Sequence, residues 1–293
     1  MIMDVSVIMP AYNAERFIEK ALDSALSQNF NGSFELLVAD DVSSDSTPQI
    51  IASYQQRYPD IIKPIFRKQN LGCSDNSVAL VSNATGKYLA FLDSDDIWVS
   101  SDKLQVQFDF MESHNEWGML CSEAYQIDGK GDVMFKTRKK DDQVVSFDIL
   151  IRRHIDVLNS SVFMRRDLYQ EMAKECQWYI DNKCFFDSVW AWWFAYRKQL
   201  YRQGKRFVAY RFLDDSDSHS SSSEKHYQSI KRYYMMKLYF LLSHPLAVEE
   251  KMDILSNEYD YLYQNARYVG EMNVRNTKAF KQMKKIKKLK FWN

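Results

Sequence analysis

Tyr88-Leu89-Ala90-Phe91-Leu92-Asp93-Ser94-Asp95-Asp96 is the stretch that decides the fold, because an apolar run ends abruptly in a cluster of carboxylates. A short apolar run with such a boundary predicts a buried strand, here over 88–92. Two carboxylates one residue apart at a strand end can bind a divalent cation with one side chain and a ribose hydroxyl with the other. Taken alone the Asp-x-Asp spacing is a weak signal, since Asp95 or Asp96 could equally cap the helix expected near Lys103.

Upstream of this stretch, apolar runs alternate with segments of helical spacing. The expected strands cover 5–9, 34–39 and 61–66. The expected helices cover 17–26, begin at an N-cap in Ser46-Thr47-Pro48, and follow Gly72, with Gly86 closing the last of them. Pro10 is expected to stop the first strand, and Pro64 indicates that the third is an edge strand or is irregular. This alternation predicts an α/β fold with a mostly parallel, Rossmann-like sheet flanked by helices.

Two acidic groups far apart in the chain each follow a predicted strand. Asp40-Asp41 comes directly after the second strand, and Asp93–Asp96 follows the fourth. Ligands of such sheets bind outside the carboxyl ends of the strands. We therefore expect both groups to line one crevice.

The second half has a mixed α+β texture. Its expected elements are a helix at 104–111, strands at 118–122, 160–164 and 207–210, a hairpin turn at 128–131, and an aromatic helix at 189–198. From about Glu224 the spacing predicts an α-helical C-terminal extension. We divide the chain into 1–100 and 101–223, two halves of one domain, and a helical region 224–293.

The composition is typical of a densely packed globular protein, and the charge balance predicts that it does not bind nucleic acid. Apolar residues make up 46% of the 293 positions, against 8 glycines and 5 prolines. Lys plus Arg and Asp plus Glu number 39 each, so the net charge gives no reason to expect a nucleic acid. The 4 cysteines are scattered and expected to be reduced. We find neither a secretory signal nor an apolar run of membrane-spanning length, which predicts a cytoplasmic protein.

Residues 275–293 form the most unbalanced segment. Between Arg275 and Lys290 every charged side chain is basic, interleaved with apolar residues at helical spacing. Such a basic amphipathic helix could lie on an anionic membrane at the inner face of the cell membrane. It could equally dock its apolar edge on the protein and leave its lysines in water.

Four further motifs occur in order before 91–96. They are Pro10-Ala11-Tyr12-Asn13, the segment 38–47, Asn70-Leu71-Gly72 and the segment 84–88. Together they resemble the family 2 glycosyltransferases, which have the GT-A fold, use nucleotide-sugar donors and invert the anomeric centre. The resemblance is specific over about 4–100 and looser to about 215.

The resemblance implies a nucleotide cradle that holds Mn²⁺ or Mg²⁺. In it Pro10, Tyr12 and Asn13 line the base and ribose, Asp40 accepts a hydrogen bond from the base, commonly uracil, Asp93 faces the ribose and Asp95 the metal. The chain departs from the family at Val42, where glycine is usual, and at 75–78, which replaces an Ala-Arg-Asn group.

The resemblance also implies a base for the acceptor hydroxyl. Asp187, in Phe186-Asp187-Ser188-Val189-Trp190, matches that residue, although it could be only the N-cap of the aromatic helix. His219 is a candidate metal ligand, or a solvated loop histidine. Trp98 is the acceptor-side candidate. Arg211 could contact diphosphate or form an ordinary surface ion pair.

The predicted function is transfer of a sugar from a nucleoside diphosphate donor, a UDP-sugar, to a hydroxyl of a glycan or lipid-linked glycan in cell-surface polysaccharide synthesis. Sugar-nucleotide pyrophosphorylases are disfavoured because the first strand has no glycine-rich loop after it. NTPase and dinucleotide motifs do not occur. The alternative is a catalytically degenerate GT-A domain that only binds a nucleotide-sugar or a partner.

Overall fold

A computed structural model describes residues 3–135, 141–152, 157–184, 187–213 and 223–256. The chain divides into two compact units, one made of 1–150 with 156–211 and the other of 151–155 with 212–293. The three-part division at 100 and 223 stays a prediction.

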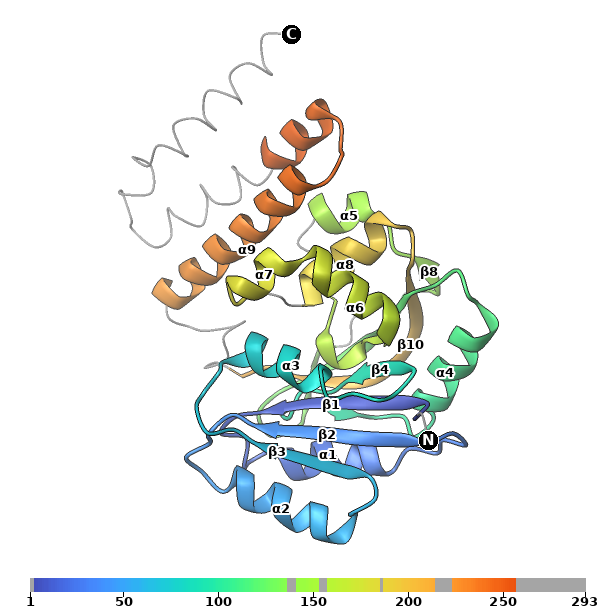
Figure 1. The fold of residues 1–293 in the computed structure, drawn as a ribbon, viewed down its shortest axis with the longest axis vertical. Coiled ribbons are helices and arrows are strands. Elements are labelled where there is room, and N and C mark those ends of the chain that lie inside the picture. Colours follow the sequence, from blue (N-terminus) through green and yellow to red (C-terminus); the bar gives the residue numbers. More distant parts are fainter. Residues whose placement is uncertain (1–2, 136–140, 153–156, 185–186, 214–222, 257–293) are drawn as a thin grey trace. The chain divides into compact units, whose positions relative to one another are not determined.

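One sheet of ten strands, counted over the described residues, runs through the first unit (Figure 1). Its strands are β1 Val5–Ala11, β2 Phe34–Asp40, β3 Ile62–Phe66, β4 Tyr88–Phe91, β5 Ile97–Trp98, β6 Met119–Ile127, β7 Val133–Phe135, β8 Gln143–Val144, β9 Phe163–Arg165 and β10 Leu200–Arg211. The strand order is β3-β2-β1-β4-β9-β6-β10-β5, with β7 beside β6 and β8 beside β10. β1 to β4 are mutually parallel, and β9 is antiparallel to both of its neighbours.

Helices cover both faces of the parallel half, which confirms the predicted α/β class. The helices of the described chain are α1 Ile18–Leu26, α2 Thr47–Arg57, α3 Cys73–Val81, α4 Lys103–Ser113, α5 Phe147–Arg152, α6 Arg166–Glu175, α7 Gln177–Asp181, α8 Asp187–Tyr196 and α9 Ser223–Ser243, with a short 3₁₀ helix, η1, at Asn159–Ser161. In Figure 1, α3 lies above β1–β3, α2 lies below them, and α1 is drawn behind β3 at the same height. Right-handed crossovers require this arrangement when the strand order reverses after β3.

The first strand continues through Pro10, where we expected it to stop. Pairing with β4 ends at Ile8 opposite Phe91, so Pro10 lies past the last residue that β4 pairs. Pairing with β2 continues, and Ala11 lies opposite Asp40. Pro10 therefore lies where only one neighbouring strand is paired. A residue without an N–H is tolerated at such a position.

Two predicted helix boundaries have different causes from those we expected. Ser46 occupies the N-cap of α2, but its side chain makes no capping bond, and Asp45 Oδ1 accepts from Thr47 N instead at 3.0 Å. Helix α3 ends at Val81 with Ser82 as its C-cap, so Gly86 does not close it.

Gly86 instead allows a close approach between strands. A Cβ at this position would lie 2.4 Å from Ser6 N. The neighbouring Thr85 donates through N and Oγ1 to the buried Glu35 carboxylate at 2.8 and 2.7 Å, and Ser6 Oγ donates to the same carboxylate at 2.6 Å. The Thr-Gly pair therefore joins the start of β4 to β1 and β2.

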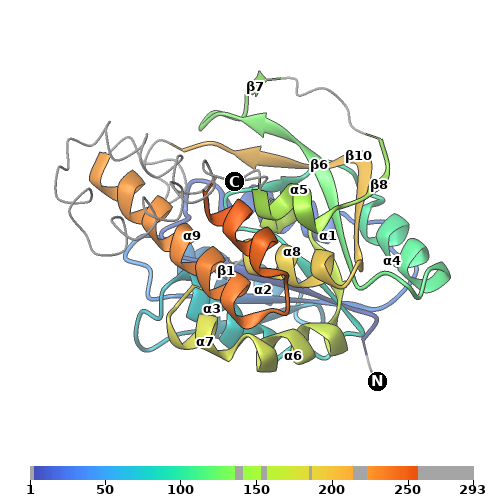
Figure 2. The same cartoon turned by 90° about the horizontal axis from the view of Figure 1, so that it is seen from above.

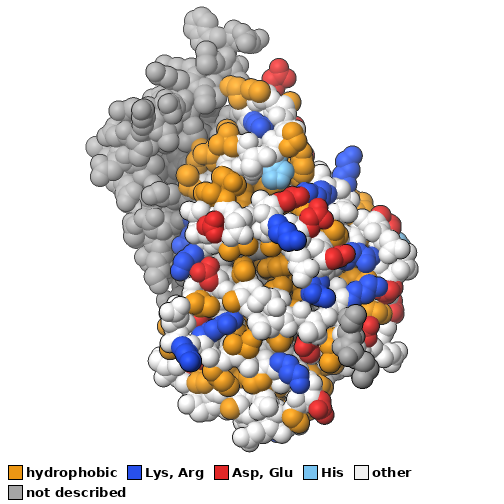
Figure 3. Space-filling model, in the orientation of Figure 1, with side chains coloured by type: hydrophobic (Ala, Val, Ile, Leu, Met, Phe, Trp, Pro, Cys, Tyr) orange, Lys and Arg blue, Asp and Glu red, His pale blue; other side chains and the backbone are white. Residues whose placement is uncertain are grey.

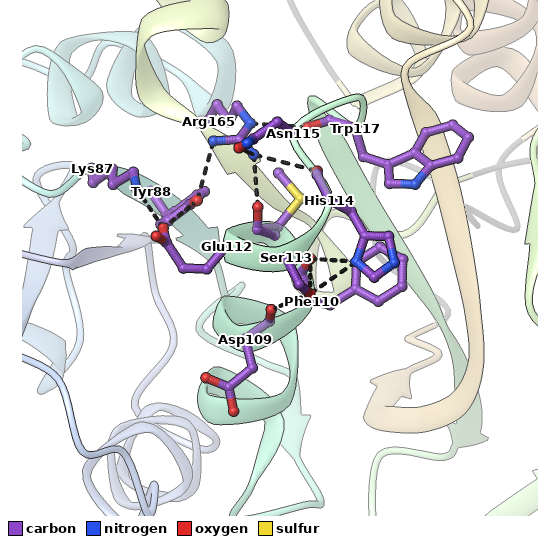
Figure 4. A network of polar contacts seen from close by, with 11 residues as sticks. Lys87, Tyr88, Asp109, Phe110, Glu112, Ser113, His114, Asn115, Trp117 and Arg165 are labelled. Atoms are coloured by element: carbon purple, nitrogen blue, oxygen red, sulfur yellow. Dashed lines mark hydrogen bonds and ion pairs between the residues drawn. The ribbon is translucent and has the colours of Figure 1, made fainter.

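A polar network fixes β4 from the other side (Figure 4). Glu112 of α4 accepts from Lys87 Nζ at 2.5 Å and from the Tyr88 hydroxyl at 2.6 Å. Arg165 of β9 donates to the same hydroxyl at 3.2 Å. Strand β4 is thus held at its start by α4 and β9, which positions the carboxylates at its end.

The second half differs from the prediction mainly in the length of its strands. β6 and β10 form a long parallel pair, seen from above in Figure 2. Their register shifts between Gln203 and Val208. The expected strand at 160–164 is replaced by η1 and the short β9. The predicted hairpin turn is confirmed, because Asp128 Oδ1 accepts from the N–H groups of Lys130, Gly131 and Asp132 between antiparallel β6 and β7.

The described part of the second unit is mainly helical, with non-helical residues at 212–213 and 244–247. Helix α9 is followed by helical residues 248–256, and Arg152 donates to Asp253 within this unit. No helix among the described residues is both long and apolar enough to cross a bilayer. On the face shown in Figure 3, basic and acidic side chains are interspersed, in keeping with the balanced charge.

Candidate functional site

The expected crevice residues do meet at one edge of the sheet. β1, β2 and β4 are adjacent and parallel, so their carboxyl ends lie side by side. Pro10 and Ala11 end β1 and Tyr12 and Asn13 follow it. Asp40 ends β2, and Asp93 follows β4 within two residues. The parallel register therefore brings the sequence-distant groups together as predicted.

Asp40 is buried but incompletely bonded. Its side chain is 4% exposed, and Oδ2 accepts from Ser43 N at 3.2 Å. Oδ1 is buried and has no hydrogen-bond partner in the described chain. A buried acceptor without a donor is rare and costs roughly 1–3 kcal/mol, so this atom is suited to a ligand N–H.

The next acidic residue, Asp41, has a different role. Its two carboxylate oxygens accept from Leu71 N and Gly72 N, each at 2.8 Å, and Asn70 Nδ2 donates to its carbonyl at 2.8 Å. The Asn-Leu-Gly motif and Asp41 together fix the loop that begins α3. Sequence reasoning did not separate this structural carboxylate from Asp40.

The loop after β1 is fastened to the loop after β2. Asn13, with φ of 47°, donates from its backbone N to Ser43 Oγ at 2.9 Å and accepts at Oδ1 from Ser44 N at 2.8 Å. Tyr12 is 55% exposed and Pro10 is partly exposed at the same edge. The three residues therefore form a fixed rim, with the Tyr12 ring open to a ligand.

Val42 shows why the family usually has glycine here. It adopts φ of 65°, a left-handed conformation that is strained for a β-branched side chain. The loop therefore has a left-handed residue at position 42, and the backbone of Val42 is strained.

Asp93 is held by η1. Its Oδ1 accepts from Asn159 Nδ2 at 2.7 Å, and its backbone N donates to Ser160 Oγ at 3.0 Å. Burial, and then the neighbouring Asp95 charge, raise the pKa of Asp93 to about 6. The carboxylates are thus crowded, and the Arg211 guanidinium supplies a nearby positive charge that partly offsets the rise that burial causes in the pKa of Asp95.

Asp96 is a structural clamp and not a helix cap. Its Oδ2 accepts from Ser160 Oγ at 2.5 Å and its Oδ1 from Arg211 N at 2.8 Å, which ties β4 to η1 and β10. Burial, with the charges of Asp95 and Asp93, raises its pKa well above the usual range. Helix α4 begins at Lys103 with Asp102 at its N-cap, so neither Asp95 nor Asp96 caps it.

Asp95 is the carboxylate left open to a ligand. None of the described hydrogen bonds has its carboxylate as acceptor from another residue, and burial raises its pKa. Over the described residues no three His, Cys, Asp or Glu side chains form a complete metal cage. The oxygen donors and the accumulated negative charge still fit a hard divalent cation that completes its coordination with ligand oxygens.

Two sequence-based candidates are buried beside this cluster. Arg211 is 3% exposed and donates from Nε to the Asp95 carbonyl and from Nη1 to the Asp128 carbonyl, so it is not a surface ion pair. Trp98 is also 3% exposed, and its indole N–H donates to the Ser160 carbonyl at 2.9 Å. The buried Trp98 ring presents no stacking face for an acceptor, and we correct that expectation to a packing role.

The aromatic helix packs beside β4. Asp187 is the first residue of α8, and its Oδ1 accepts from Ser188 N at 2.7 Å. The ring of Trp190, one turn further, lies 4.7 Å from that of Phe91, near the end of β4. The start of α8 therefore lies along the strand that carries the acidic cluster. Trp190, Trp192 and Trp193 are buried, as core packing predicts.

Some candidates lie outside the described residues, and others were missed. His219 and the segment 275–293 fall in undescribed stretches. Asn159 and Ser160 were missed because we assigned this region to a strand. The only signal was the run of small polar residues 159–161 before an apolar strand.

The model of the family described as glycosyl transferase family 2 matches residues 6–173, more than half of the chain. This protein belongs to glycosyl transferase family 2. The matched segment contains every rim and acidic residue of the crevice, from Pro10 to Asp96, and η1.

Relatives of this glycosyltransferase support the assignment. The chain is 33% identical over 184 residues to an uncharacterised protein of Mycobacterium tuberculosis, covering 60% of this chain and 52% of that protein. It is 37% identical over 111 residues to the Escherichia coli UDP-Glc:alpha-D-GlcNAc-diphosphoundecaprenol beta-1,3-glucosyltransferase WfgD, covering 38% and 42%. The chain thus spans about half the length of the curated relatives it matches.

Solved structures confirm the GT-A fold. Residues 1–349 of S. aureus TarS, in complex with UDP-GlcNAc, superpose with a TM-score of 0.65 at 20% identity, covering 93% of this chain and 77% of that one. The Pyrobaculum calidifontis mannosyltransferase PcManGT, in complex with GDP-Man and Mn²⁺, gives 0.59 at 13% identity, covering 97% and 79%. At these identities the likeness concerns the fold.

Proposed function

We propose that the crevice binds a nucleoside diphosphate sugar, with a UDP-sugar as donor, and transfers the sugar with inversion to a hydroxyl of a glycan or lipid-linked glycan in cell-surface polysaccharide synthesis. The observation that carries the proposal is the pairing of an unpartnered buried acceptor, Asp40 Oδ1, with an open carboxylate, Asp95, at one sheet edge. The first needs an N–H donor such as a base supplies. The second needs a cation such as accompanies a diphosphate.

The donor then lies across the strand ends. The base hydrogen-bonds to Asp40, Pro10, Tyr12 and Asn13 line the base and ribose, and Asp93 accepts from a ribose hydroxyl. Asp95 would hold Mn²⁺ or Mg²⁺. When bound, the cation neutralises the charge that develops on the leaving diphosphate. WfgD, by its name, uses UDP-Glc, and the TarS crystal contains UDP-GlcNAc, which favours uridine as the nucleoside.

Asp187 accepts the proton of the attacking hydroxyl. Two observations support this role of Asp187. Helix α8 packs along β4, and the Asp187 carboxylate lies at the first residue of that helix. Because one oxygen already accepts from Ser188 N, capping and catalysis use the same side chain.

Calorimetric titration tests donor binding. UDP, GDP and dTDP are each titrated with Mn²⁺ and with EDTA against wild type, Asp95→Ala and the surface control Asp60→Ala. We expect UDP to bind only with Mn²⁺, unchanged in Asp60→Ala and lost in Asp95→Ala. Metal-independent binding that survives Asp95→Ala would refute the metal role of Asp95.

Asp187→Asn separates binding from transfer. This substitution keeps the size of the side chain and one acceptor oxygen for Ser188 N, so UDP affinity should be preserved. Transfer to acceptor should fall by about 100-fold or more. Near-wild-type turnover would remove Asp187 from the role.

A second candidate is a degenerate domain that binds a donor or partner without transfer. The strained Val42 and the altered segment 75–78 favour it. Any turnover of a bound donor, including slow hydrolysis, would exclude it.

We also propose that residues 275–293 bring the enzyme to the inner face of an anionic membrane, where lipid-linked acceptors lie. The support is the basic amphipathic sequence alone. Wild type should sediment with anionic vesicles at low salt, and a chain lacking 275–293 should not. Equal sedimentation of both would refute docking by this segment.

A further inference from the structure

Arg67 lies beside Asp40 at the outer end of the crevice. It directly follows β3, and its backbone N donates to the Asp40 carbonyl at 3.0 Å. Because β3 is at the edge of the sheet, Arg67 is the last side chain at this end of the row of strand ends.

The guanidinium of Arg67 is fixed by a buried asparagine of α3. Arg67 Nε donates to Asn76 Oδ1 at 3.0 Å, and Asn76 Nδ2 donates to the Ala39 carbonyl at 3.1 Å. Asn76 is almost fully buried. It belongs to the segment 75–78 that departs from the family pattern, so the departure supplies the group that orients Arg67.

One nitrogen of this guanidinium is left without a partner. Arg67 Nη2 is buried and makes no hydrogen bond in the described chain, as is true of Asp40 Oδ1. Residues 40 and 67 therefore offer a buried donor and a buried acceptor that do not satisfy each other. A ligand edge that carries a carbonyl oxygen next to an N–H would satisfy both.

The position of Arg67 points to the base and not to the diphosphate. The order β3-β2-β1-β4 puts three strand spacings, about 14 Å, between Arg67 and the acidic cluster after β4. The base and the phosphates are at opposite ends of a nucleotide. A donor with its phosphates at Asp95 extends its base toward β2 and β3.

We propose that Arg67 is a base-binding residue whose Nη2 donates to a carbonyl oxygen of the donor base, beside the N–H that Asp40 accepts. Asn76 is its positioning residue. This role rests on the proposed donor site. Arg67 and Asp40 together would recognise the imide edge of a base such as uracil.

The test compares ligands that contain only one end of the donor. The affinities of UMP, UDP and Mn²⁺-pyrophosphate are measured for wild type, Arg67→Met, Arg67→Lys and the exposed neighbour control Lys68→Met. We expect Arg67→Met and Arg67→Lys to weaken UMP and UDP equally, by about 10- to 100-fold, with pyrophosphate affinity unchanged. Lys68→Met should match wild type.

Other results would overturn the inference. Loss of UDP and pyrophosphate affinity with UMP unchanged would assign Arg67 to the diphosphate, and unchanged affinity for all three ligands would remove it from the site. If wild type bound none of the ligands, both the donor site and this inference would fail. Urea unfolding of each variant checks that the fold is intact, and Asn76→Ala should weaken UMP less than Arg67→Met does.

Discussion

Asp40 and Asp41 are neighbours in sequence with opposite hydrogen-bonding states. Asp41 accepts from two backbone N–H groups, whereas one oxygen of Asp40 is buried without a partner. Asp96 and Asp95 repeat the contrast after β4, because Asp96 accepts from Ser160 and Arg211. Because buried polar groups are almost always paired, the satisfied carboxylates hold the crevice together and the unsatisfied ones are available to ligands.

The strain at Val42 predicts a stabilising substitution. Val42→Gly removes a β-branched side chain from φ of 65°, and the side chain is largely exposed, so little packing is lost. We expect a gain of about 1 kcal/mol in unfolding free energy, after the entropy cost of glycine. Urea denaturation measures it. Val144→Gly, at an exposed strand position, should destabilise, and an equal loss at Val42 would contradict the strain argument.

Lys103 predicts a pH-dependent stability. It is fully buried, donates to Gln107 Oε1 at 2.7 Å and lies 4.2 Å from the Trp98 ring, and burial lowers its pKa from 10.5 to about 7. Between about pH 7 and pH 10.5 the unfolded chain holds this proton and the folded chain releases it. The contribution of Lys103 to stability therefore rises with pH across this window and is most unfavourable below it.

Lys103→Met should remove this dependence. The variant should be more stable than wild type at pH 7, and the difference should shrink as the pH approaches 10. Urea unfolding at several pH values measures the difference, with the exposed Lys20→Met as control. A difference that stays constant with pH would refute the lowered pKa of Lys103 in the folded state.

At the scale of elements, short connections decide the site geometry more than the long helices do. The 3₁₀ helix η1 supplies Asn159 and Ser160, and the end of β10 supplies Arg211, all bonded to residues 93–96. These segments come from the second half of the chain. The donor-binding half alone therefore does not contain all the groups that orient its acidic cluster.

The contact between β4 and β1 predicts the effect of Gly86→Ala. The new Cβ would meet Ser6 N at 2.4 Å and Val5 C at 2.6 Å, both backbone atoms that cannot rotate away. We expect a loss of about 1–3 kcal/mol in unfolding free energy. Asn83→Ala, at an exposed position nearby, should cost less. A neutral Gly86→Ala would mean that the strands separate easily.

At the scale of the whole molecule, ligand binding should stabilise the unit that holds the sheet. Asp40 and Asp95 lie at one site only in the folded chain, so UDP with Mn²⁺ should raise the thermal midpoint. At a ligand concentration of 100 times Kd, the expected gain in unfolding free energy is about 2.7 kcal/mol. Six of the 7 tryptophans lie between Trp98 and Trp193, so fluorescence reports this unit. Asp95→Ala should show no shift, and a shift that persists in EDTA would contradict metal-linked binding.

The sequence by itself determined the α/β class, the parallel character of the sheet formed by the first four strands, and the placement of Asp40 and Asp93–Asp96 after strands two and four. These follow from local periodicity and from the rule that parallel strands end together. The same local patterns identified the hairpin at 128–131 and the aromatic helix α8.

Only the tertiary structure decided what each carboxylate does. Asp96 is a clamp because Ser160 and Arg211, far along the chain, donate to it, whereas no described residue donates to Oδ1 of Asp40. Trp98 is buried and Gly86 is required for the same reason, since their neighbours come from distant segments. Such partners cannot be identified from the residues next to a carboxylate in sequence. Whether a buried polar atom is hydrogen-bonded depends on every residue that the fold brings near it.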